Sequence, residues 1–278
     1  MTDKTDSSTV SALWPRYAGH RDQQMRRIRE LHRSGSQTIC ILSAGSCADL
    51  DLQELSRMFA EVHLADINPL SVYKGLAEQQ ADQLPGFVVH APYDVTGVNE
   101  RLAQWSKQSP AETEIEKLLL QISSPPFLPG CFDLVVSACL MSQLFLPAKK
   151  SRVSQEYRNR ILFAIRKQHL LTLLAMTKPG GTALLVSDVA AFETEQDFSA
   201  ARDPALQEIM LEMIRRKNFF TGTNPIAIFN EINKTPEISL AISELNYCPP
   251  WLWQMFEDRV YIVYAIALQK ITETGLPK

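Results

Sequence analysis

Short apolar runs and longer amphipathic segments follow one another along the middle of the chain. The apolar runs are nearly continuous, as strands buried on both faces of a parallel sheet usually are, and the segments between them have helical spacing. This alternation predicts a parallel sheet with right-handed crossovers. Five strands are expected at 38–44, 61–66, 87–94, 131–139 and 182–189. Helices are expected between them at 51–60, 68–84, 97–121 and 150–177.

Local signals support several of these elements. Asp51 and Glu54 have the spacing of a capping box at the start of the first helix. Pro69 stands in the first turn of the next helix, where proline is well tolerated. Two segments read as breaks instead: SSPPFLPG at 123–130 is a proline-rich loop, and KPGG at 178–181 is a sharp turn before the fifth strand.

Both ends of the chain depart from the alternation. A polar tail is expected at 1–10, followed by one or two helices at 11–34. The C-terminal part adds helices at 203–217 and 225–233, and two strands at 238–247 and 259–269 that flank the connection PPWLWQMFED. We expect these two strands to be antiparallel to each other.

The predicted fold class is therefore α/β, with a doubly wound, mostly parallel seven-stranded sheet whose last strand is antiparallel. The sheet and its helices form a Rossmann-like domain at 35–278, and residues 1–34 form an N-terminal tail and helical extension. The length of 278 residues and a hydrophobic fraction of 45% are enough for one large domain with a sizeable core.

Charge and residue usage narrow the function. The net charge is −3, which does not favour a nucleic-acid partner. The basic cluster at 21–33 lies beside acids and is expected to be a solvated helix face. Five cysteines without a CxxC motif argue against a disulfide framework, and five histidines without ligand-like spacing argue against a metal site. No signal peptide and no apolar run of about 18 residues is seen, so we expect a cytoplasmic protein without a membrane partner.

Candidate chemistry lies where the expected strands end, because ligands of open α/β sheets bind outside the carboxyl ends of the strands. The first strand runs into GSCADLD at 45–51, in which Gly45 permits a tight turn. Asp49 and Asp51 would repel a pyrophosphate at the following helix N-terminus. A ligand with a cationic or zwitterionic end would not be repelled, since an acid can take its ammonium group and backbone N–H groups its carboxylate.

Asp66 ends the second strand, 21 positions after Gly45. An acid at this place is suited to accept two hydrogen bonds from ribose hydroxyls. Alternatively, Asp66 caps the helix that opens at Asn68 and Pro69. The glycine turn before it and the acid after the third strand favour the ribose role.

Asp94 follows the third strand within APYDVTG. Its carboxylate could accept from the exocyclic amine of adenine while Tyr93 or Val95 packs against the ring. An Asx-turn would suit the same residues, and both interpretations can hold together.

In this pattern the chain resembles the class I S-adenosylmethionine (SAM)-dependent methyltransferases over roughly 38–190, and KPGGTALLV matches the PGG-like turn that precedes the family's fifth strand. The resemblance implies that the first loop binds the methionine part of SAM, that the acid after the second strand binds ribose, that the third loop binds adenine and that the fourth lines the methyl-transfer site. The implied cofactor-binding residues, in chain order, are Ala44, Gly45, Ser46, Cys47, Asp49, Asp66, Ile67, Asn68, Tyr93, Asp94, Val95, Ser137 and Ala138.

The first loop departs from the family pattern acid-x-Gly-x-Gly-x-Gly. Ser43 replaces the acid, and Cys47 and Asp49 replace two glycines. We therefore expect this loop to bend differently or the following helix to start later. The Asn-Pro-Pro-aromatic sequence of many base and amine methylases is absent after the fourth strand, where SACLMSQL stands. Its absence disfavours methylation of DNA bases or of protein glutamine.

Methyl transfer is an in-line displacement that depends mainly on proximity and alignment, so no fixed catalytic motif is required. The catalytic candidates are Gln143, Asp188 and Glu193 near the strand ends, and Tyr17 on an N-terminal segment that could close over the site with Trp14 and His20. The WLW stretch at 251–253 could line an apolar pocket for the methyl acceptor. The alternatives are a surface position for His20 and core positions for the tryptophans.

Three functions are compatible with these residues. The first is a SAM-dependent methyltransferase acting on a small-molecule acceptor. The second is an NAD-dependent oxidoreductase, which would share Asp66 but lacks GxGxxG. The third is a non-catalytic binding or scaffold protein that keeps the fold. No pattern in the sequence specifies an oligomer.

Overall fold

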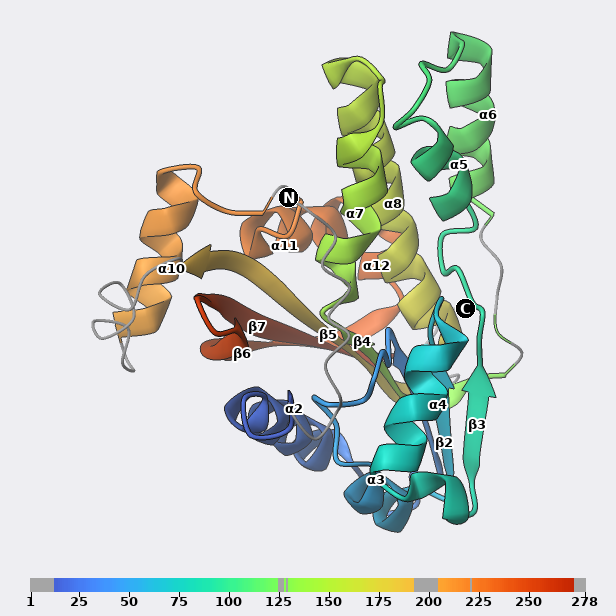
Figure 1. The fold of residues 1–278 in the computed structure, drawn as a ribbon, viewed down its shortest axis with the longest axis vertical. Helices are drawn as coiled ribbons and strands as arrows, with labels where there is room; N and C mark the ends of the chain where they lie inside the picture. Colours follow the sequence, from blue (N-terminus) through green and yellow to red (C-terminus); the bar gives the residue numbers. More distant parts are fainter. Residues whose placement is uncertain (1–12, 125–127, 129, 193–204, 221, 273–278) are drawn as a thin grey trace.

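The computed structural model describes residues 13–124, 128, 130–192, 205–220 and 222–272. Seven strands form one sheet with helices on both faces (Figure 1). The strands are β1 (Thr38–Leu42), β2 (Glu61–Ala65), β3 (Phe87–His90), β4 (Phe132–Ala138), β5 (Thr177–Phe192), β6 (Ile242–Phe256) and β7 (Arg259–Lys270). Their order in the sheet is β3-β2-β1-β4-β5-β7-β6.

The sheet is parallel from β3 to β5, and β7 is antiparallel to both of its neighbours, β5 and β6. This confirms the predicted seven-stranded sheet with an antiparallel last strand, and the antiparallel pairing of the two late strands. The switch in strand order lies between β1 and β4. From β1 the chain continues to β2 toward one edge of the sheet, and from β4 it continues to β5 toward the other edge.

The helices cover the two faces in separate groups (Figure 1). On one face, α2 (Ala18–Leu31), α3 (Leu52–Met58) and α4 (Pro69–Glu78) contribute to one apolar core, and α2 lies beside β6. The helices whose side chains enter the core of the other face are α5 (Asn99–Gln104), α6 (Glu112–Ile122), α7 (Leu140–Lys150), α8 (Gln155–Met176), α10 (Ala205–Arg215), α11 (Pro225–Lys234) and α12 (Pro236–Ser239).

Strand β7 corresponds to the apolar run at 259–269 that was predicted as a strand, and its packing explains the apolar sequence. Ile262, Tyr264 and Ile266 belong to one core, and Tyr261 and Val263 belong to the other. Successive side chains of a strand point to opposite faces, so a strand covered on both sides is apolar at every position.

Two expected helices have different bounds. The helix expected at 97–121 is two helices, α5 and α6, and Pro110 lies in the non-helical stretch between them, where the residue before a proline avoids helical backbone angles. The helix expected at 68–84 ends at Glu78, and a short 3₁₀ turn at Ala81–Gln83 follows it.

Helix α7 was not predicted, and the helix expected to begin at residue 150 begins at Gln155. The sequence conceals α7 because Pro147 lies inside it and because its start has no Ser, Thr, Asp or Asn cap. Cys139 occupies the cap position with a φ of 47°.

Two late segments also differ from the prediction. Most of PPWLWQMFED belongs to β6, which runs to Phe256, whereas the strand expected to begin at 238 starts at Ile242, after α12. KPGG is a bulge within β5, since Thr177 pairs with Phe132 and Thr182 pairs with Leu134. The polar tail expected at 1–10 and part of the loop expected at 123–130 lie outside the described residues.

Among the residues that the structure describes, none of the helices combines the length and the apolar character needed to cross a bilayer.

Candidate functional site

A cleft of about 150 Å³ opens at the carboxyl ends of β1 to β4, next to the switch in strand order. Open α/β sheets bind their ligands at this place. The residues predicted from the sequence that line the cleft are Asp66, Ile67, Tyr93, Asp94, Val95 and Gln143. The fold therefore brings together predicted residues from three separate strand ends.

The loop after β1 has a left-handed backbone at alternate positions. The φ angles are 64° at Ser43, 53° at Gly45 and 55° at Cys47, although only the second is a glycine. Non-glycine residues adopt such angles rarely, and strained backbone of this kind clusters at functional sites. Helix α3 starts after this loop at Leu52, with Asp51 as its cap. The helix start agrees with the expected range of 51–60, and the two alternatives, a different bend or a later start than in the family, stay predictions.

Helix α4 supports this loop from one side. A Cβ atom added to Gly75 would collide with the carbonyl oxygen of Ser46, so the helix approaches the loop as closely as glycine allows. One turn later, the Gln79 side chain donates from Nε2 to the carbonyl oxygen of Cys47 at 2.7 Å. An isolated glycine inside a predicted helix was the sequence signal for this close contact.

Helix α2 supports the same loop from the other side. Arg21 donates to the carbonyl oxygen of Ala48 at 3.0 Å, and Gln24 donates from Nε2 to that of Asp49 at 3.2 Å. Arg21 is buried and also stacks over the Trp14 ring at 3.5 Å from its centroid. The expectation that the basic cluster is a solvated face is therefore wrong for Arg21.

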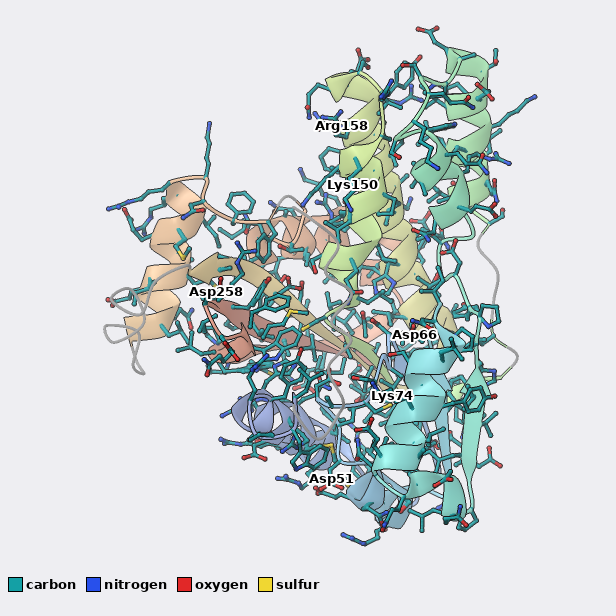
Figure 2. The ribbon with its side chains drawn as sticks, viewed as in Figure 1. Asp51, Asp66, Lys74, Lys150, Arg158 and Asp258 are labelled. Carbon is teal, nitrogen blue, oxygen red and sulfur yellow. The ribbon has the colours of Figure 1, made fainter. Side chains whose placement is uncertain are left out.

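Asp66 joins the first two strand-end loops. Its Oδ2 accepts from the backbone N–H of Gly45 and its Oδ1 accepts from that of Asn68, both at 2.8 Å. Asn68 itself caps α4, through its side chain and the N–H of Ser71. Figure 2 shows Asp66 at the N-terminal end of α4. Each carboxylate oxygen can accept a second hydrogen bond, so Asp66 still has acceptor capacity for a ligand in the cleft.

Asp94 forms the turn that the sequence suggested. Its Oδ1 accepts from the backbone N–H of Thr96 at 3.0 Å and from its hydroxyl at 2.7 Å, and its Oδ2 accepts from the N–H of Asn99 at 2.8 Å. The Asx-turn interpretation is thus confirmed. Because Asp94 also lines the cleft, its role toward adenine stays a prediction.

The residues at the end of β4 lie below the cleft. Ser137 is fully buried, with its Oγ 2.8 Å from Nε2 of His169, and Ala138 is buried in the opposite core. Neither side chain lines the cleft. In their place α7 presents Leu140, Leu144 and Pro147 to the cleft, three residues that were not predicted to lie there.

Of the catalytic candidates, Gln143 alone lines this cleft among the described residues. Its Nε2 donates to the carbonyl oxygen of Cys139 at 3.2 Å and lies 3.4 Å from Oγ of Ser43. Tyr17 is buried, with its ring nearly perpendicular to that of Trp253. Glu193 lies outside the described residues.

Asp188 is buried near the end of β5, where Ser142 donates to its Oδ1 at 2.7 Å. Burial raises the pKa of Asp188 to about 6, although the Ser142 hydrogen bond and the charge of Lys149 act in the opposite direction. The residue does not line the cleft.

Two further titratable groups lie at the base of the first loop: His20, which is buried, and Asp49, whose side chain is 15% exposed. Burial raises the pKa of Asp49 to about 6, and the carboxylate of Asp66 adds to the rise. Burial lowers the pKa of His20 to about 3. His20 is 1% exposed, so the expected surface position is wrong. Its neighbours Trp251 and Trp253 are buried as well, as the core alternative predicted.

No protein-family model matches the chain, and no curated protein matches it. The N-methyltransferase NodS from Bradyrhizobium japonicum WM9, in complex with S-adenosyl-L-homocysteine, is a similar solved structure with 12% identity and a TM-score of 0.45, over 90% of this chain and 86% of that chain. The YcgJ protein from Bacillus subtilis has 11% identity and a TM-score of 0.48, over 91% of this chain and 100% of that chain.

A SAM-dependent methyltransferase from Leishmania major has 9% identity and a TM-score of 0.48, over 91% of this chain and 72% of that chain. At such identities and TM-scores, these likenesses carry no weight for the activity of this chain. Its function has to be inferred from its own residues.

Proposed function

We propose that the protein is a SAM-dependent methyltransferase that acts on a small molecule. The observation that carries the proposal is the place of Asp66, whose carboxylate spans the loops after β1 and β2 and lines the cleft. In this proposal Asp66 accepts from the ribose hydroxyls. Ile67, which is 49% exposed, and Val95 pack against the adenine ring, and the loop at 44–49 holds the amino-acid end of the cofactor.

The charges around the cleft favour a ligand with positive groups. Asp66 and Asp94 line it, and Asp49 lies close enough for the charge of Asp66 to raise its pKa. None of the described residues that line the cleft is a lysine, an arginine or a histidine. SAM carries a sulfonium and an ammonium group, and opposite charges at short range attract.

A dinucleotide fits the same surroundings poorly. Two N–H groups at the start of α3 already have acceptors, because Leu52 donates to Oε1 of Gln79 and Glu54 donates to Oδ1 of Asp51. A pyrophosphate would therefore find fewer donors there and would meet the Asp51 carboxylate. In addition, dinucleotide-binding sheets have the order 3-2-1-4-5-6, whereas an antiparallel β7 follows β5 here.

The acceptor is proposed to be small because the net charge of −3 gives no electrostatic footprint for nucleic acid. Catalysis then consists mainly of holding the acceptor in line with the methyl group, which is worth as much as about 7–11 kcal/mol in favourable cases. Gln143 is the candidate to orient the acceptor, since its amide lies in the cleft wall.

The test is a set of thermal unfolding experiments with saturating SAM, S-adenosylhomocysteine (SAH) or NADH. A ligand that binds only the folded state at 100 times its Kd adds about 2.7 kcal/mol, which corresponds to a rise of several degrees in Tm. We expect this rise with SAM and with SAH but not with NADH. The Asp66→Asn variant should lose most of it, while Asp82→Asn, the same change at an exposed residue of the 3₁₀ turn, should keep it.

Other results of the unfolding experiments would support one of the two alternative functions. A rise with NADH alone would replace the proposal with the oxidoreductase. No rise with any of the three ligands, for a protein that unfolds cooperatively, would favour the non-catalytic binding or scaffold protein.

A further inference from the structure

His20 has a defined protonation state inside the protein. The indole of Trp251 donates from Nε1 to Nδ1 of His20 at 2.9 Å. An indole N–H can only donate, so Nδ1 must be the unprotonated nitrogen. Because burial lowers the pKa of His20 to about 3, the ring is neutral near pH 7. The one ring proton therefore lies on Nε2.

The ring is also fixed in orientation. It stacks on Trp253 with 4.3 Å between the ring centroids and an angle of 15° between the planes, and on Trp251 at 5.9 Å and 30°. Trp253 therefore covers one face of the ring and Trp251 engages its edge at Nδ1, so the orientation of the ring is restrained from two sides.

The carboxylate of Asp49 lies near the other ring nitrogen. Nε2 lies 3.9 Å from Oδ2 of Asp49 and has no hydrogen-bond partner, although it is buried. A buried donor without a partner is costly, so a small movement of the Asp49 side chain toward His20 is favourable. The backbone of Asp49 is held in place meanwhile, since Gln24 binds its carbonyl oxygen.

We propose that His20 is a positioning residue, which donates from Nε2 to Asp49 and so orients this carboxylate toward the ammonium group at the amino-acid end of SAM. This inference rests on the proposed function. One carboxylate oxygen then accepts from His20 and the other accepts from the ammonium. Trp251 acts one step further away, by keeping the ring proton of His20 on Nε2.

The response to pH separates this arrangement from a structural role. Asp49 interacts electrostatically with five titratable or charged groups, which are His20, Arg21, Cys47, Asp66 and Cys139. Burial lowers the pKa of His20 to about 3 and raises the pKa of both thiols well above the usual value, so none of these three titrates between pH 5 and 7. A change of SAH affinity in that range that disappears in Asp49→Asn belongs to Asp49.

The test compares SAH with 5′-methylthioadenosine, which has the same adenosine but lacks the amino-acid end. Dissociation constants are measured by calorimetry for the wild type, His20→Phe and Asp49→Asn, with His32→Gln as the control. His32 lies just after the same helix, and its ring contacts the carbonyl oxygen of Met58. We expect both test variants to bind SAH about ten- to a hundredfold more weakly and to bind methylthioadenosine within about twofold of the wild type.

Between pH 7 and pH 5 the wild type should lose affinity for SAH and keep its affinity for methylthioadenosine, and Asp49→Asn should show no such loss. If His20→Phe does not fold, Trp251→Phe provides the same comparison, since it removes the donor that fixes the tautomer and retains an aromatic ring. Its loss of SAH affinity should be smaller than that of Asp49→Asn.

Equal losses for the two ligands, or unchanged SAH binding in His20→Phe, would overturn the inference while leaving the proposed function in place. A wild type that binds neither SAH nor methylthioadenosine would overturn the proposed function itself, and the inference with it.

Discussion

Two glycines of the site are required for different physical reasons. Gly45 has a φ of 53°, and a Cβ atom added to it would meet nothing within 4 Å. Gly75 lies in α4 without a positive φ, but a Cβ atom there would collide with the backbone of Ser46. Gly45 is needed for its positive φ, and Gly75 is needed for the close contact between α4 and the backbone of Ser46.

We predict that Gly45→Ala costs about 1–2 kcal/mol of unfolding free energy, the usual cost of a left-handed backbone angle for a residue with a side chain. Gly75→Ala should cost as much or more, since the loop or the helix must move, and it should also weaken SAH binding because the loop carries Asp49. Urea unfolding and calorimetry of the two variants check this. A Gly75→Ala protein with the stability and SAH affinity of the wild type would show that the collision is relieved without consequence.

At the residue scale, the sequence predicted those residues whose place at the cleft follows from their position after a strand. Asp66 and Asp94 were found in this way, because the end of a parallel strand defines their place. For His20 the sequence suggested a place on a closing N-terminal segment or at the surface, but its contacts could not be predicted, since Trp251 and Asp49 lie 231 and 29 positions away and nothing local connects them. Residues that act through tertiary contacts leave no periodic pattern in the sequence.

At the scale of single elements, α3 realises half of the predicted capping box. Asp51 accepts from the backbone N–H of Glu54 at 2.8 Å. The Glu54 side chain does not return to the cap but pairs with Arg29 of α2 at 2.6 Å. One residue therefore fixes where the helix starts, and the other links two helices.

We predict that Asp51→Ala destabilises the protein by about 1 kcal/mol, the usual cost of losing a helix cap. Glu54→Gln should cost less than about 1 kcal/mol, because its ion pair with Arg29 is partly solvent-exposed. Urea unfolding at low and at high salt distinguishes the two, since salt should reduce only the effect at Glu54. A salt-dependent cost at Asp51 would indicate that charge, and not capping, is responsible.

The elements that the sequence predicted well are those with a period and clear ends. The five parallel strands were placed because each is an apolar run between helical segments. Helix α7 was missed because Pro147 and the absence of a cap hide it, and β6 was shortened because PPWLWQMFED contains two prolines. Tertiary packing overrode local signals in both cases, and α7 forms one wall of the cleft.

At the scale of the whole molecule, buried carboxyl groups and buried histidines have opposite effects on the pH dependence of stability. Burial raises the pKa values of Asp49 and Asp188 to about 6, so the stability they contribute is present below about pH 4 and is lost as the pH rises through 6. Burial lowers the pKa values of His20 and His169 to about 3 and about 4. Their contribution is present above pH 6.5 and is lost as the pH falls through 4 and 3.

We predict that Asp188→Asn becomes more stable relative to the wild type as the pH rises from 4 to 7, by about 3 kcal/mol at most. The reason is that the variant has no buried carboxyl group to ionise at this position, whereas the wild type must ionise one as the pH passes 6. Urea unfolding of both proteins at four pH values provides the measurement. A difference that stays constant over this range would mean that Asp188 titrates as an ordinary exposed acid.

The contact between His20 and Trp251 joins segments that a ribosome makes far apart in time. A nascent chain can form the first strands and α3 from its own early residues. It cannot enclose His20 until β6 has been made and has paired with β7. The base of the loop after β1 is thus among the last parts of the molecule to become complete during synthesis, and a nascent chain halted before residue 251 has the loop without the contact between His20 and Trp251.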